Sequence, residues 1–369
     1  IFANTSWNIY NFRINLIKFL IKKKYNVTNF SGKDKYSEKL NQFDFKNIFF
    51  DIKNRDLNII NQILIIFKIL YFLYIQKPNV VLSFTIKMNI YIGLIRLIFF
   101  NFIFIPNITG LGSSFDKKSK FRSMYIILYK LSFKKANHVF FQNNRDYRYF
   151  RKLKIVENNF TIIPGSGIDV EAYKYKKLIL NKNIKFLFAS RLLKEKGIRE
   201  YLLAAEIIKK KYKNASFYVL GSLEDEKNKK IEKILLNYHN KKIINYLGVT
   251  NDIPHHIMET DCLIMPTYYN EGIPRILIEA AALGRPIITT NQAGCKDICI
   301  NNYNGFIINK KNLKDLSLLI EKYINLSDEK KNIFSQNGRK LVEAKFNDSI
   351  ILEKYYHAIE NNFKNIWVY

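Results

Sequence analysis

Short apolar runs alternate with longer stretches in which apolar positions recur every three or four residues, along most of the chain. The short runs are typical of buried strands and the longer stretches of amphipathic helices. The predicted strands are 45–50, 79–84, 101–106, 137–142, 160–165, 184–190, 215–221, 243–248, 262–266 and 285–290. The predicted helices are 10–23, 58–75, 88–99, 120–134, 144–153, 197–211, 226–238, a short one between 248 and 262, one after Pro274, 312–325, 328–345 and 348–363, and 304–308 is expected to be a turn. Such alternation predicts an α/β fold with parallel sheets covered by helices.

One segment, 165–183, breaks the alternation because it mixes glycine with charge and has no periodicity. It is interpreted as a linker between two domains, 1–168 and 169–345, with a last helical segment at 346–369. The length of 369 residues suits two domains of ordinary size. Two such domains are expected to enclose a cleft faced by the carboxyl ends of their strands. The opening "IFANTSW" lacks a Met and suggests a first strand without its beginning.

The chain is strongly basic, with a formal net charge of +29. Residues 1–168 hold 27 basic and 8 acidic residues, so this half carries most of the excess. Such a field favours phosphates, either of nucleic acid or of anionic lipid. The sequence is rich in Lys, Ile and Asn throughout, and a general compositional bias of this kind is an alternative explanation for part of the excess of Lys. Residues 117–135 carry seven Lys or Arg and no acid among aromatic and aliphatic residues, which suits either a helix on anionic lipid or a domain helix with a solvated face.

Three cysteines without CxxC spacing indicate a reducing compartment rather than a disulfide framework. No secretory signal is visible. The longest apolar stretch, 60–75, is short and is interrupted by Asn61, Gln62 and Lys68, so we expect a buried helix and no transmembrane segment.

Two carboxylates, Glu271 and Glu279, flank the proline of "EGIPRILIEA". Pro274 suits the first turn of a helix, whose unpaired amides favour an anion or a hydroxyl-rich group. Glu279 would lie about 12 Å further along, at about 1.5 Å per residue. Carboxylates so placed suit gripping a sugar at two points better than cleaving a glycosidic bond between them. The alternative is that both are ordinary charges on a helix face.

Charged residues also follow a predicted strand in "ASRLLKEKG". Arg191 lies at the strand end and Lys196 just before the next helix, so the two could clamp a diphosphate. Gly221 in "VLGS" offers a second strand end where the backbone can approach phosphate closely. In "NITGLGSSF", Gly110 and Gly112 allow a tight turn beside the expected cleft, although a simple turn explains them equally.

Several common catalytic patterns are missing. No two aspartates lie two residues apart, so the DxD metal clamp is not present. The sequence contains no GxSxG, no Walker motif, no GxGxxG and no HExxH, and His255–His256 is interpreted as the cap of a surface helix. Hydrolase, kinase-like and dehydrogenase functions therefore lose support.

Taken together, these stretches resemble the family-4 (GT4) glycosyltransferases. "EGIPRILIEA" is similar to their E-x7-E signature and "ASRLLKEKG" to their phosphate-gripping loop. Other stretches resemble the bacterial branch that builds polysaccharide repeat units on a polyprenyl-diphosphate carrier: "NTSWNIYNFR", "SFTIKMNIYIG", "NITGLGSSF", "VFFQN" and "IPGSGIDVEAY". The resemblance runs in order from about residue 4 to about residue 345.

The resemblance implies a GT-B fold of two Rossmann-like domains, with a C-terminal helix crossing back to the first. It implies that Glu279 holds the ribose of a nucleotide-sugar, that Glu271 holds the donor hexose, and that Arg191 and Lys196 bind the diphosphate. Backbone at Gly272, Ile273 and Pro274 would meet the sugar, and backbone near Val249 the base. On the acceptor side, the matching stretches contain Lys87, Gly110 and Gly112. The sequence departs from many relatives by lacking a glycine-rich turn at "NTSWN" and by placing Asp297 where glutamate is more frequent.

The resulting hypothesis is a retaining, metal-independent glycosyltransferase without a cofactor. It would move a hexose or N-acetylhexosamine from a UDP-sugar to a polyprenyl-diphosphate-linked saccharide, for a surface polysaccharide such as capsule or O-antigen. It would act as a peripheral protein on the cytoplasmic face of the inner membrane, with anionic lipid as a partner. A UDP-sugar 2-epimerase of the same fold is the alternative enzyme, although no cleft histidine is evident. A nucleic-acid-binding protein would explain the charge but lacks a stacking platform or recognition helix. A catalytically silent partner of a glycan assembly complex is disfavoured by Arg191, Lys196, Glu271 and Glu279 together.

Overall fold

The computed structural model describes residues 1–51, 58–99, 101–111, 115, 122–179, 182–223, 229–269 and 272–366. The chain divides into two compact units. Unit 1 comprises Ile1–Ser166 and Asp348–Tyr369, and unit 2 comprises Gly167–Asn347. Each unit is built on one sheet whose described strands all pair in parallel. The α/β architecture expected from the alternating pattern is therefore confirmed.

Unit 1 has a seven-stranded sheet in the order β3-β2-β1-β4-β5-β6-β7. Its strands are β1 (Phe2–Ala3), β2 (Thr28–Gly32), β3 (Lys46–Phe50), β4 (Val80–Phe84), β5 (Ile103–Ile108), β6 (Val139–Phe141) and β7 (Phe160–Ile162). Its helices are α1 (Ser6–Phe12), α2 (Ile14–Lys22), α3 (Ser37–Leu40), α4 (Ile59–Gln76), α5 (Ile86–Ile98), α6 (Arg122–Phe133), α7 (Asn144–Lys152) and α15 (Asp348–Ile366). The chain order reverses beside β1, which is the arrangement that gives ligands access to strand carboxyl ends.

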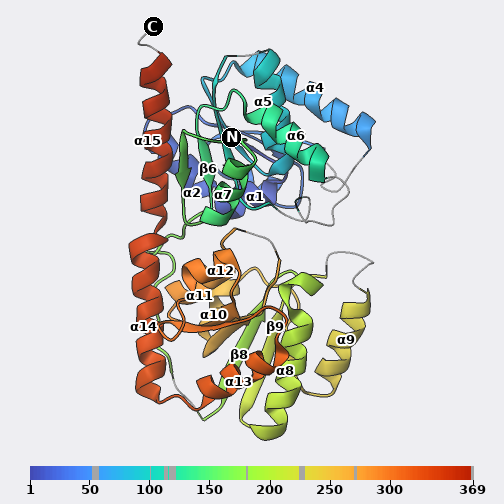
Figure 1. The fold of residues 1–369 in the computed structure, drawn as a ribbon, viewed down its shortest axis with the longest axis vertical. Coiled ribbons are helices and arrows are strands. Elements are labelled where there is room, and N and C mark those ends of the chain that lie inside the picture. The colour runs from blue at the N-terminus through green and yellow to red at the C-terminus, as the bar shows by residue number, and fades with distance from the viewer. Residues whose placement is uncertain are drawn as a thin grey trace. The chain divides into compact units, whose positions relative to one another are not determined.

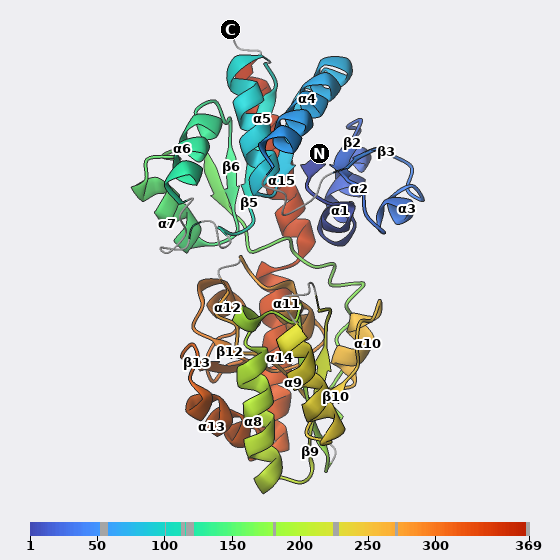
Figure 2. The same cartoon turned by 90° about the vertical axis from the view of Figure 1, so that its right-hand side faces the viewer.

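Alternate residues of each central strand serve two separate cores, as the pleat requires. Val81 and Phe104 pack beneath α4 and α5, while the adjacent Leu82 and Ile105 pack beneath α2 and α15. Helices α4, α5 and α6 therefore cover one face of the sheet, and α2 and α15 cover the other (Figures 1 and 2). On α15, the ring of Tyr355 lies 4.3 Å from that of Phe140, so the C-terminal helix belongs to the core of unit 1.

Unit 2 has a six-stranded sheet in the order β10-β9-β8-β11-β12-β13. Its strands are β8 (Ile184–Ala189), β9 (Ala215–Leu220), β10 (Asn245–Tyr246), β11 (Cys262–Met265), β12 (Ile287–Thr290) and β13 (Gly305–Ile308). Its helices are the 3-10 turn η2 (Lys194–Lys196), α8 (Ile198–Lys211), α9 (Lys229–Asn240), α10 (Ile253–Met258), α11 (Arg275–Ala282), α12 (Ala293–Ile298), α13 (Leu313–Ile324) and α14 (Asp328–Lys345). Helix α8 packs with α13, and α11 packs with α14 (Figures 1 and 2).

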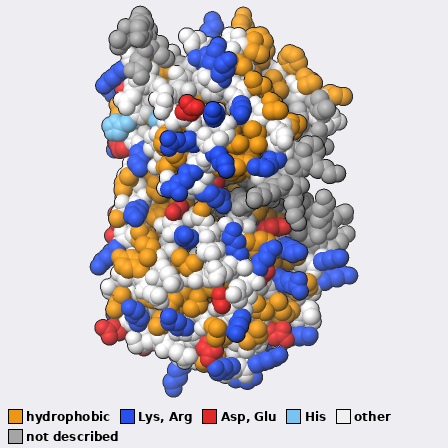
Figure 3. Space-filling view, viewed as in Figure 1, with side chains coloured by type: hydrophobic (Ala, Val, Ile, Leu, Met, Phe, Trp, Pro, Cys, Tyr) orange, Lys and Arg blue, Asp and Glu red, His pale blue; other side chains and the backbone are white. Residues whose placement is uncertain are grey.

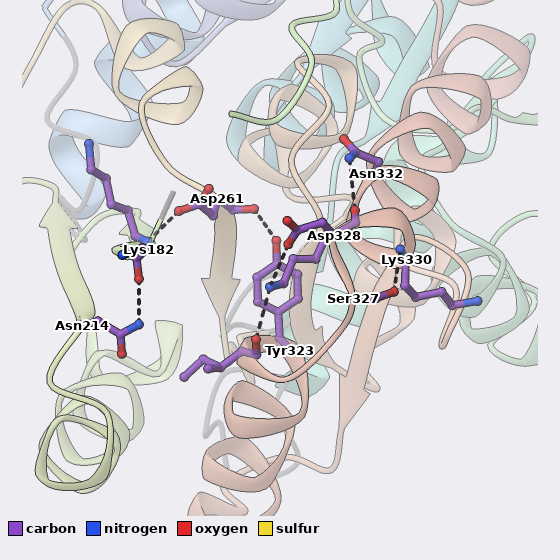
Figure 4. A network of polar contacts seen from close by, with 11 residues as sticks. Lys182, Asn214, Asp261, Tyr323, Ser327, Asp328, Lys330 and Asn332 are labelled. Carbon is purple, nitrogen blue, oxygen red and sulfur yellow. Dashed lines mark hydrogen bonds and ion pairs between the residues drawn. The ribbon is translucent and has the colours of Figure 1, made fainter. Parts of the chain in front are cut away.

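A polar network secures the amino-terminal edge of the unit 2 sheet, the edge where β8 and β11 begin. Asp261 accepts from the backbone amide of Lys185 at 2.7 Å, and the Tyr323 hydroxyl donates to the carbonyl of Asp261 at 2.7 Å. Figure 4 shows Asp261 and Tyr323 in this arrangement, with Ser327 accepting from the amide of Lys330 at the start of α14. These bonds satisfy polar groups that burial would otherwise leave without water, so the network is a structural one.

Side-chain caps define several helix starts. Thr5, Asn58, Asn143, Asp252, Asn312 and Ser327 each accept from a backbone amide in the first turn that follows. Such a cap contributes about 1 kcal/mol to helix stability. The cap of α10 is therefore Asp252, and the prediction that His255–His256 form a helix cap is wrong.

Several elements differ from the sequence predictions, and the short helices α3 and α12 were not predicted at all. The helix expected at 10–23 is two helices, α1 and α2, because the chain leaves helical geometry at Arg13, whose guanidinium is buried 3.9 Å from the centre of the Phe84 ring. The strand β2 was not predicted, since its buried Asn29 and Ser31 are polar and form hydrogen bonds instead of an apolar run. The turn expected at 304–308 contains strand β13, paired with β12.

Candidate donor site of unit 2

The loop after β8 carries two of the predicted residues. Arg191 is exposed, whereas Lys196 is 6 % exposed at the end of η2, with its Nζ 5.4 Å from the centre of the Tyr269 ring. Gly197 follows with a φ of 84°, and a Cβ there would lie 2.3 Å from the carbonyl oxygen of Pro266. Glycine is therefore required for the close approach that sets the position of Lys196 before α8 begins.

The loops after β8 and β11 are fastened to each other. The backbone amide of Tyr268 donates to the carbonyl of Glu195 at 2.8 Å, and the Thr267 hydroxyl donates to the same oxygen at 3.2 Å. Because β8 and β11 are neighbours in a parallel sheet, both loops emerge at its carboxyl-terminal edge. Lys196 is buried in this rigid surrounding at the sheet edge, and that position makes its ammonium a candidate anion contact.

Gly221 directly follows β9, which neighbours β8 on the side opposite β11. Its φ is 151°, and a Cβ would lie 1.8 Å from the carbonyl oxygen of Ser190, immediately before Arg191. The amide of Gly221 donates to the carbonyl of Gly248 at 2.9 Å, and its own carbonyl accepts from the Tyr246 hydroxyl at 3.0 Å. The strand-end glycine thus brings together the loops of Arg191 and of Val249, whose side chain is 64 % exposed.

The helix start after β11 is packed against α12. Gly272, Ile273 and Pro274 are buried, and a Cβ on Gly294 would lie 1.9 Å from the carbonyl oxygen of Gly272. Helix α11 follows at Arg275, with no side-chain hydrogen bond from its N-cap residue Pro274. The amide of Leu277 donates to the carbonyl of Pro274 at 3.1 Å, and a helix start of this kind favours a polar or anionic ligand.

Glu279, one turn into α11, is 7 % exposed and is held by two side chains. The Arg275 guanidinium donates to its Oε1 at 2.9 Å, and the Tyr173 hydroxyl donates to the same atom at 3.1 Å. Burial raises the pKa of Tyr173 to about 12, with the charge of Glu279 adding to the rise. Burial acts to lower the pKa of Arg275, but the charges of Glu279 and Tyr173 outweigh it and leave that pKa raised. Tyr173 therefore stays neutral and Arg275 stays charged at neutral pH.

The structure assembles only part of the predicted site within unit 2. Arg191, Lys196, Gly221, Val249 and the segment Gly272–Pro274 lie on loops of one sheet edge or at the start of α11. Glu271 and Gly112 lie outside the described residues. Lys87 and Gly110 belong to unit 1, Lys87 in the first turn of α5 and Gly110 after β5 with a φ of 139°.

The sequence interpretation assigned no role to the side chains of Tyr173, Arg275 and Tyr269. Arg275 precedes Glu279 by one helical turn, a spacing at which opposite charges pair, so the sequence contained that signal. Tyr173 stands 106 positions from Glu279, and only the fold reveals the contact. Thr85 was also missed: it has a φ of 81° at the end of β4, and its hydroxyl donates to Asn4 at 2.8 Å. Such backbone strain in a β-branched residue is frequent at functional positions.

Comparisons with known proteins agree with this arrangement. The sequence model of the family described as "Glycosyl transferases group 1" matches residues 169–341. The chain is a glycosyltransferase, and its residues 169–341 match the group 1 family. A Campylobacter jejuni protein, N,N'-diacetylbacillosaminyl-diphospho-undecaprenol alpha-1,3-N-acetylgalactosaminyltransferase, is 27 % identical over 97 % of this chain and 97 % of its own. The Staphylococcus aureus capsular polysaccharide biosynthesis glycosyltransferase CapM is 29 % identical over 92 % and 90 %.

Solved structures confirm the fold of this glycosyltransferase. Anabaena HepE in complex with UDP superimposes with a TM-score of 0.80 at 15 % identity, covering 98 % of this chain and 99 % of that one. Sucrose-phosphate synthase from Thermosynechococcus elongatus gives a TM-score of 0.82 at 16 % identity, with coverage of 97 % and 94 %. The GT-B fold implied by the sequence motifs is thereby confirmed, and the epimerase alternative loses its support because the curated relatives are transferases.

Among the described residues, no group of three or more His, Cys, Asp and Glu side chains is arranged to hold a metal ion. The same part of the chain contains no helix long and apolar enough to cross a membrane.

Proposed function

We propose that this glycosyltransferase moves a hexose or N-acetylhexosamine from a UDP-sugar to a saccharide carried on polyprenyl diphosphate, with retention of anomeric configuration. Two relatives support the acceptor class by name, the Campylobacter jejuni enzyme and an Escherichia coli UDP-Gal:alpha-D-GlcNAc-diphosphoundecaprenol alpha-1,3-galactosyltransferase, 28 % identical over 53 % of each chain. The latter name also supports a UDP-sugar donor. The product would enter a surface polysaccharide such as capsule or O-antigen, as the name of CapM supports.

The observation that carries the proposal is where two buried, oppositely charged side chains of unit 2 lie: Lys196 is on the loop after β8, and Glu279 is on α11. Buried charges are kept where they are used or paired. Lys196 lies beside backbone loops at the sheet edge, which suits the diphosphate of a nucleotide-sugar. Glu279 is oriented by Arg275 and Tyr173 and can accept from the ribose hydroxyls.

The chemistry follows from where charge develops. Breaking the bond between the anomeric carbon and the diphosphate leaves the electron pair on the phosphate oxygen. The acceptor hydroxyl oxygen bonds to the anomeric carbon and its proton leaves with the diphosphate. Fixed positive groups such as Lys196 and Arg191 would stabilise the transition state more than the bound substrate. Glu271 would contact the donor hexose, and we propose that the reaction needs no metal ion or cofactor.

The proposed setting is the cytoplasmic face of the inner membrane, with the protein peripheral and nucleic acid not a partner. The lipid-linked acceptors in the names of the relatives support a setting at a membrane.

Calorimetric titration of UDP into the protein with EDTA present tests the donor assignment. We expect micromolar binding that Glu279→Ala weakens, while GDP and ADP bind less well. Incubation with UDP-hexoses and UDP-N-acetylhexosamines and a polyprenyl-diphosphate-linked saccharide should then yield a lengthened glycolipid. Failure of UDP, GDP and ADP to bind would contradict the donor site, and activity that disappears with EDTA and returns with a divalent ion would contradict metal independence.

A further inference from the structure

Helix α4 presents an apolar face to the outside of unit 1. Its exposed members recur at three- and four-residue intervals and are each between 46 % and 69 % exposed: Ile60, Ile63, Leu64, Phe67, Tyr71, Tyr74 and Ile75. At about 100° per residue they share one sector of roughly 120°. The opposite side of the helix, with Ile65, Ile69 and Leu73, is buried in the core. The helix is therefore apolar on both sides, although the protein covers only one.

Helix α5, beside α4, and helix α6, on the other side of α5, add further exposed apolar residues. Helix α5 packs against both α4 and α6 in the layer over the same sheet face. At the end of α5, Ile98 and Phe99 are 70 % and 61 % exposed. On α6, Met124, Ile127 and Leu131 are also exposed, at the same helical spacing. Figure 3 shows hydrophobic side chains gathered over α4. These exposed residues of α4, α5 and α6 are called the α4–α6 surface below, and isolated exposed residues on an ordinary surface do not form such a set.

The charged residues of helices α4, α5 and α6 are all basic. Between residues 57 and 145 the chain has a single acidic residue, Asp116, against twelve Lys or Arg. Lys68 and Lys77 are exposed at α4, and Lys130, Lys134 and Lys135 are exposed at α6 and its end. An apolar face bordered by cations, with tyrosines among its members, matches the boundary between acyl chains and anionic head groups.

We propose that the α4–α6 surface docks on a bilayer containing anionic lipid, with the apolar side chains of α4 entering the head-group boundary. A second copy of the chain is the competing occupant of such a face. A symmetric pair would bring the same basic borders together without acidic partners, whereas anionic lipid neutralises them. The α4 helix does not span the bilayer, since its other side is part of the protein core.

This inference goes beyond the proposed function, because it identifies the helix that contacts the membrane. The sequence alone singled out 117–135 for that role. Helix α6, Arg122–Phe133, contributes only three exposed apolar residues, while α4 contributes seven. The contribution of α6 is then mainly its charge.

The test is sedimentation of the protein with vesicles of phosphatidylcholine, with and without phosphatidylglycerol. The probe variant is Leu64→Gln/Phe67→Gln/Tyr71→Gln, whose three sites are 53 %, 61 % and 69 % exposed, so the core is unaffected. The matched control is Ile207→Gln/Ile234→Gln/Leu318→Gln, at exposed apolar sites of unit 2 (47 %, 44 % and 53 %). We expect the unsubstituted protein and the control to bind vesicles with phosphatidylglycerol, and the probe variant to bind about 100-fold less tightly. Lys68→Gln/Lys130→Gln should reduce the preference for phosphatidylglycerol over phosphatidylcholine alone.

Two results would overturn the proposal. One is equal vesicle binding by the probe variant and the unsubstituted protein, or no vesicle binding by either. The other is a dimer of the unsubstituted protein that becomes monomeric in the probe variant by light scattering, which would make the surface a contact between copies. Vesicle binding needs no substrate, so it is independent of the proposed reaction. The probe variant should still transfer sugar to a short-chain, water-soluble acceptor. If neither the unsubstituted protein nor the variants transfer sugar although the unsubstituted protein binds vesicles, only the proposed function is contradicted.

Discussion

Arg275 and Glu279 face each other across one turn of α11, with the guanidinium Nε 2.9 Å from the carboxylate Oε1. The Tyr173 hydroxyl reaches that same oxygen from the segment before β8. Both bonds fall on one carboxylate oxygen, which fixes the side chain of a buried acid before any ligand arrives. Such preorganisation reduces the cost of ordering a site on binding. We expect the second oxygen, Oε2, to accept from the ribose hydroxyls of the donor.

Glu279→Gln should weaken UDP binding by roughly tenfold or more. The substitution keeps the size of the side chain but replaces a charge-assisted acceptor with a neutral amide, a loss of about 1.5–3 kcal/mol. Isothermal calorimetry at constant ionic strength measures the change. Glu343→Gln is the matched control, because Glu343 also pairs with an arginine one turn away, Arg339, but lies on an exposed part of α14. Equal affinity in Glu279→Gln and the control would remove Glu279 from the site.

Tyr173→Phe should weaken UDP binding by about threefold to tenfold. The variant loses one hydrogen bond to Glu279 and keeps the ring, and a single neutral bond contributes about 0.5–1.5 kcal/mol. Since the pKa of Tyr173 is raised to about 12 by burial, the hydroxyl stays a donor up to pH 10. The affinity difference between Tyr173→Phe and the unsubstituted protein should therefore be constant from pH 7 to pH 10. A difference that vanishes by pH 10 would show that the hydroxyl ionises within that range.

Lys196→Ala should lower kcat by about 10²- to 10³-fold without unfolding the protein, by analogy with removal of an oxyanion donor. The ammonium is buried on a loop fixed by Gly197 and by the bond from Tyr268 to Glu195. Lys194→Ala is the control, because Lys194 is exposed two positions earlier in the same turn. Steady-state transfer assays separate kcat from KM, and circular dichroism checks the fold. A near-normal kcat in Lys196→Ala would assign the charge to binding or to structure alone.

The α/β alternation and the order of most elements could be predicted because buried strands are apolar and helices keep one apolar face. The predictions failed where polar groups replace that pattern or local geometry interrupts it. In strand β2 the buried side chains of Asn29 and Ser31 are polar and form hydrogen bonds. In 10–23 the helical spacing of apolar residues continues through Arg13, although the helix is interrupted there. No local pattern records that the chain turns at Arg13.

The candidate site was predictable to the extent that it depends on local spacing. The sequence predicted that Lys196 follows a strand and that Glu279 lies in the helix after Pro274. Both positions can be read from the expected boundaries of strands and helices. The contact of Tyr173 with Glu279 and the requirement for Gly294 beside Gly272 depend on how distant segments pack. The exposed face of α4 was interpreted as a buried helix, because an apolar residue at a given position does not reveal whether a second surface covers it.

Gly294→Ala should destabilise unit 2 by about 1–3 kcal/mol and weaken donor binding at the same time. The added methyl group would lie 1.9 Å from the carbonyl oxygen of Gly272 and 3.0 Å from the Cα of Ile273, so the loop before α11 must move. Gly338→Ala, on α14, is the control: the nearest atoms to its added methyl group belong to Ala281 and lie 3.5 Å away, an ordinary contact distance. Urea unfolding and UDP titration of both variants check the prediction. We expect lower stability and lower UDP affinity in Gly294→Ala but not in Gly338→Ala. Unchanged UDP affinity in Gly294→Ala would contradict the role of the loop.

His138 should make unit 1 less stable in acid. It lies just before β6, with Nε2 2.9 Å from the Thr161 hydroxyl, and burial lowers its pKa to about 4. In the unfolded chain the pKa is about 6.5. Above pH 6.5 the histidine is neutral in both states and contributes nothing to the pH dependence. Between about pH 6.5 and pH 4 the unfolded chain binds the proton first, so stability falls by up to about 3 kcal/mol.

The measurement is the free energy of unfolding in urea at pH 7 and at pH 4.5, for the unsubstituted protein and for His138→Gln. Carboxylates change stability in the same range, but they contribute equally to both proteins. On acidification from pH 7 to pH 4.5, the free energy of unfolding should therefore fall by about 1–3 kcal/mol less in His138→Gln than in the unsubstituted protein. His357→Gln, on α15, provides the comparison for a histidine substitution elsewhere in unit 1. A gap for His138→Gln that stays the same at both pH values would mean that the folded protein accepts the proton as readily as the unfolded chain.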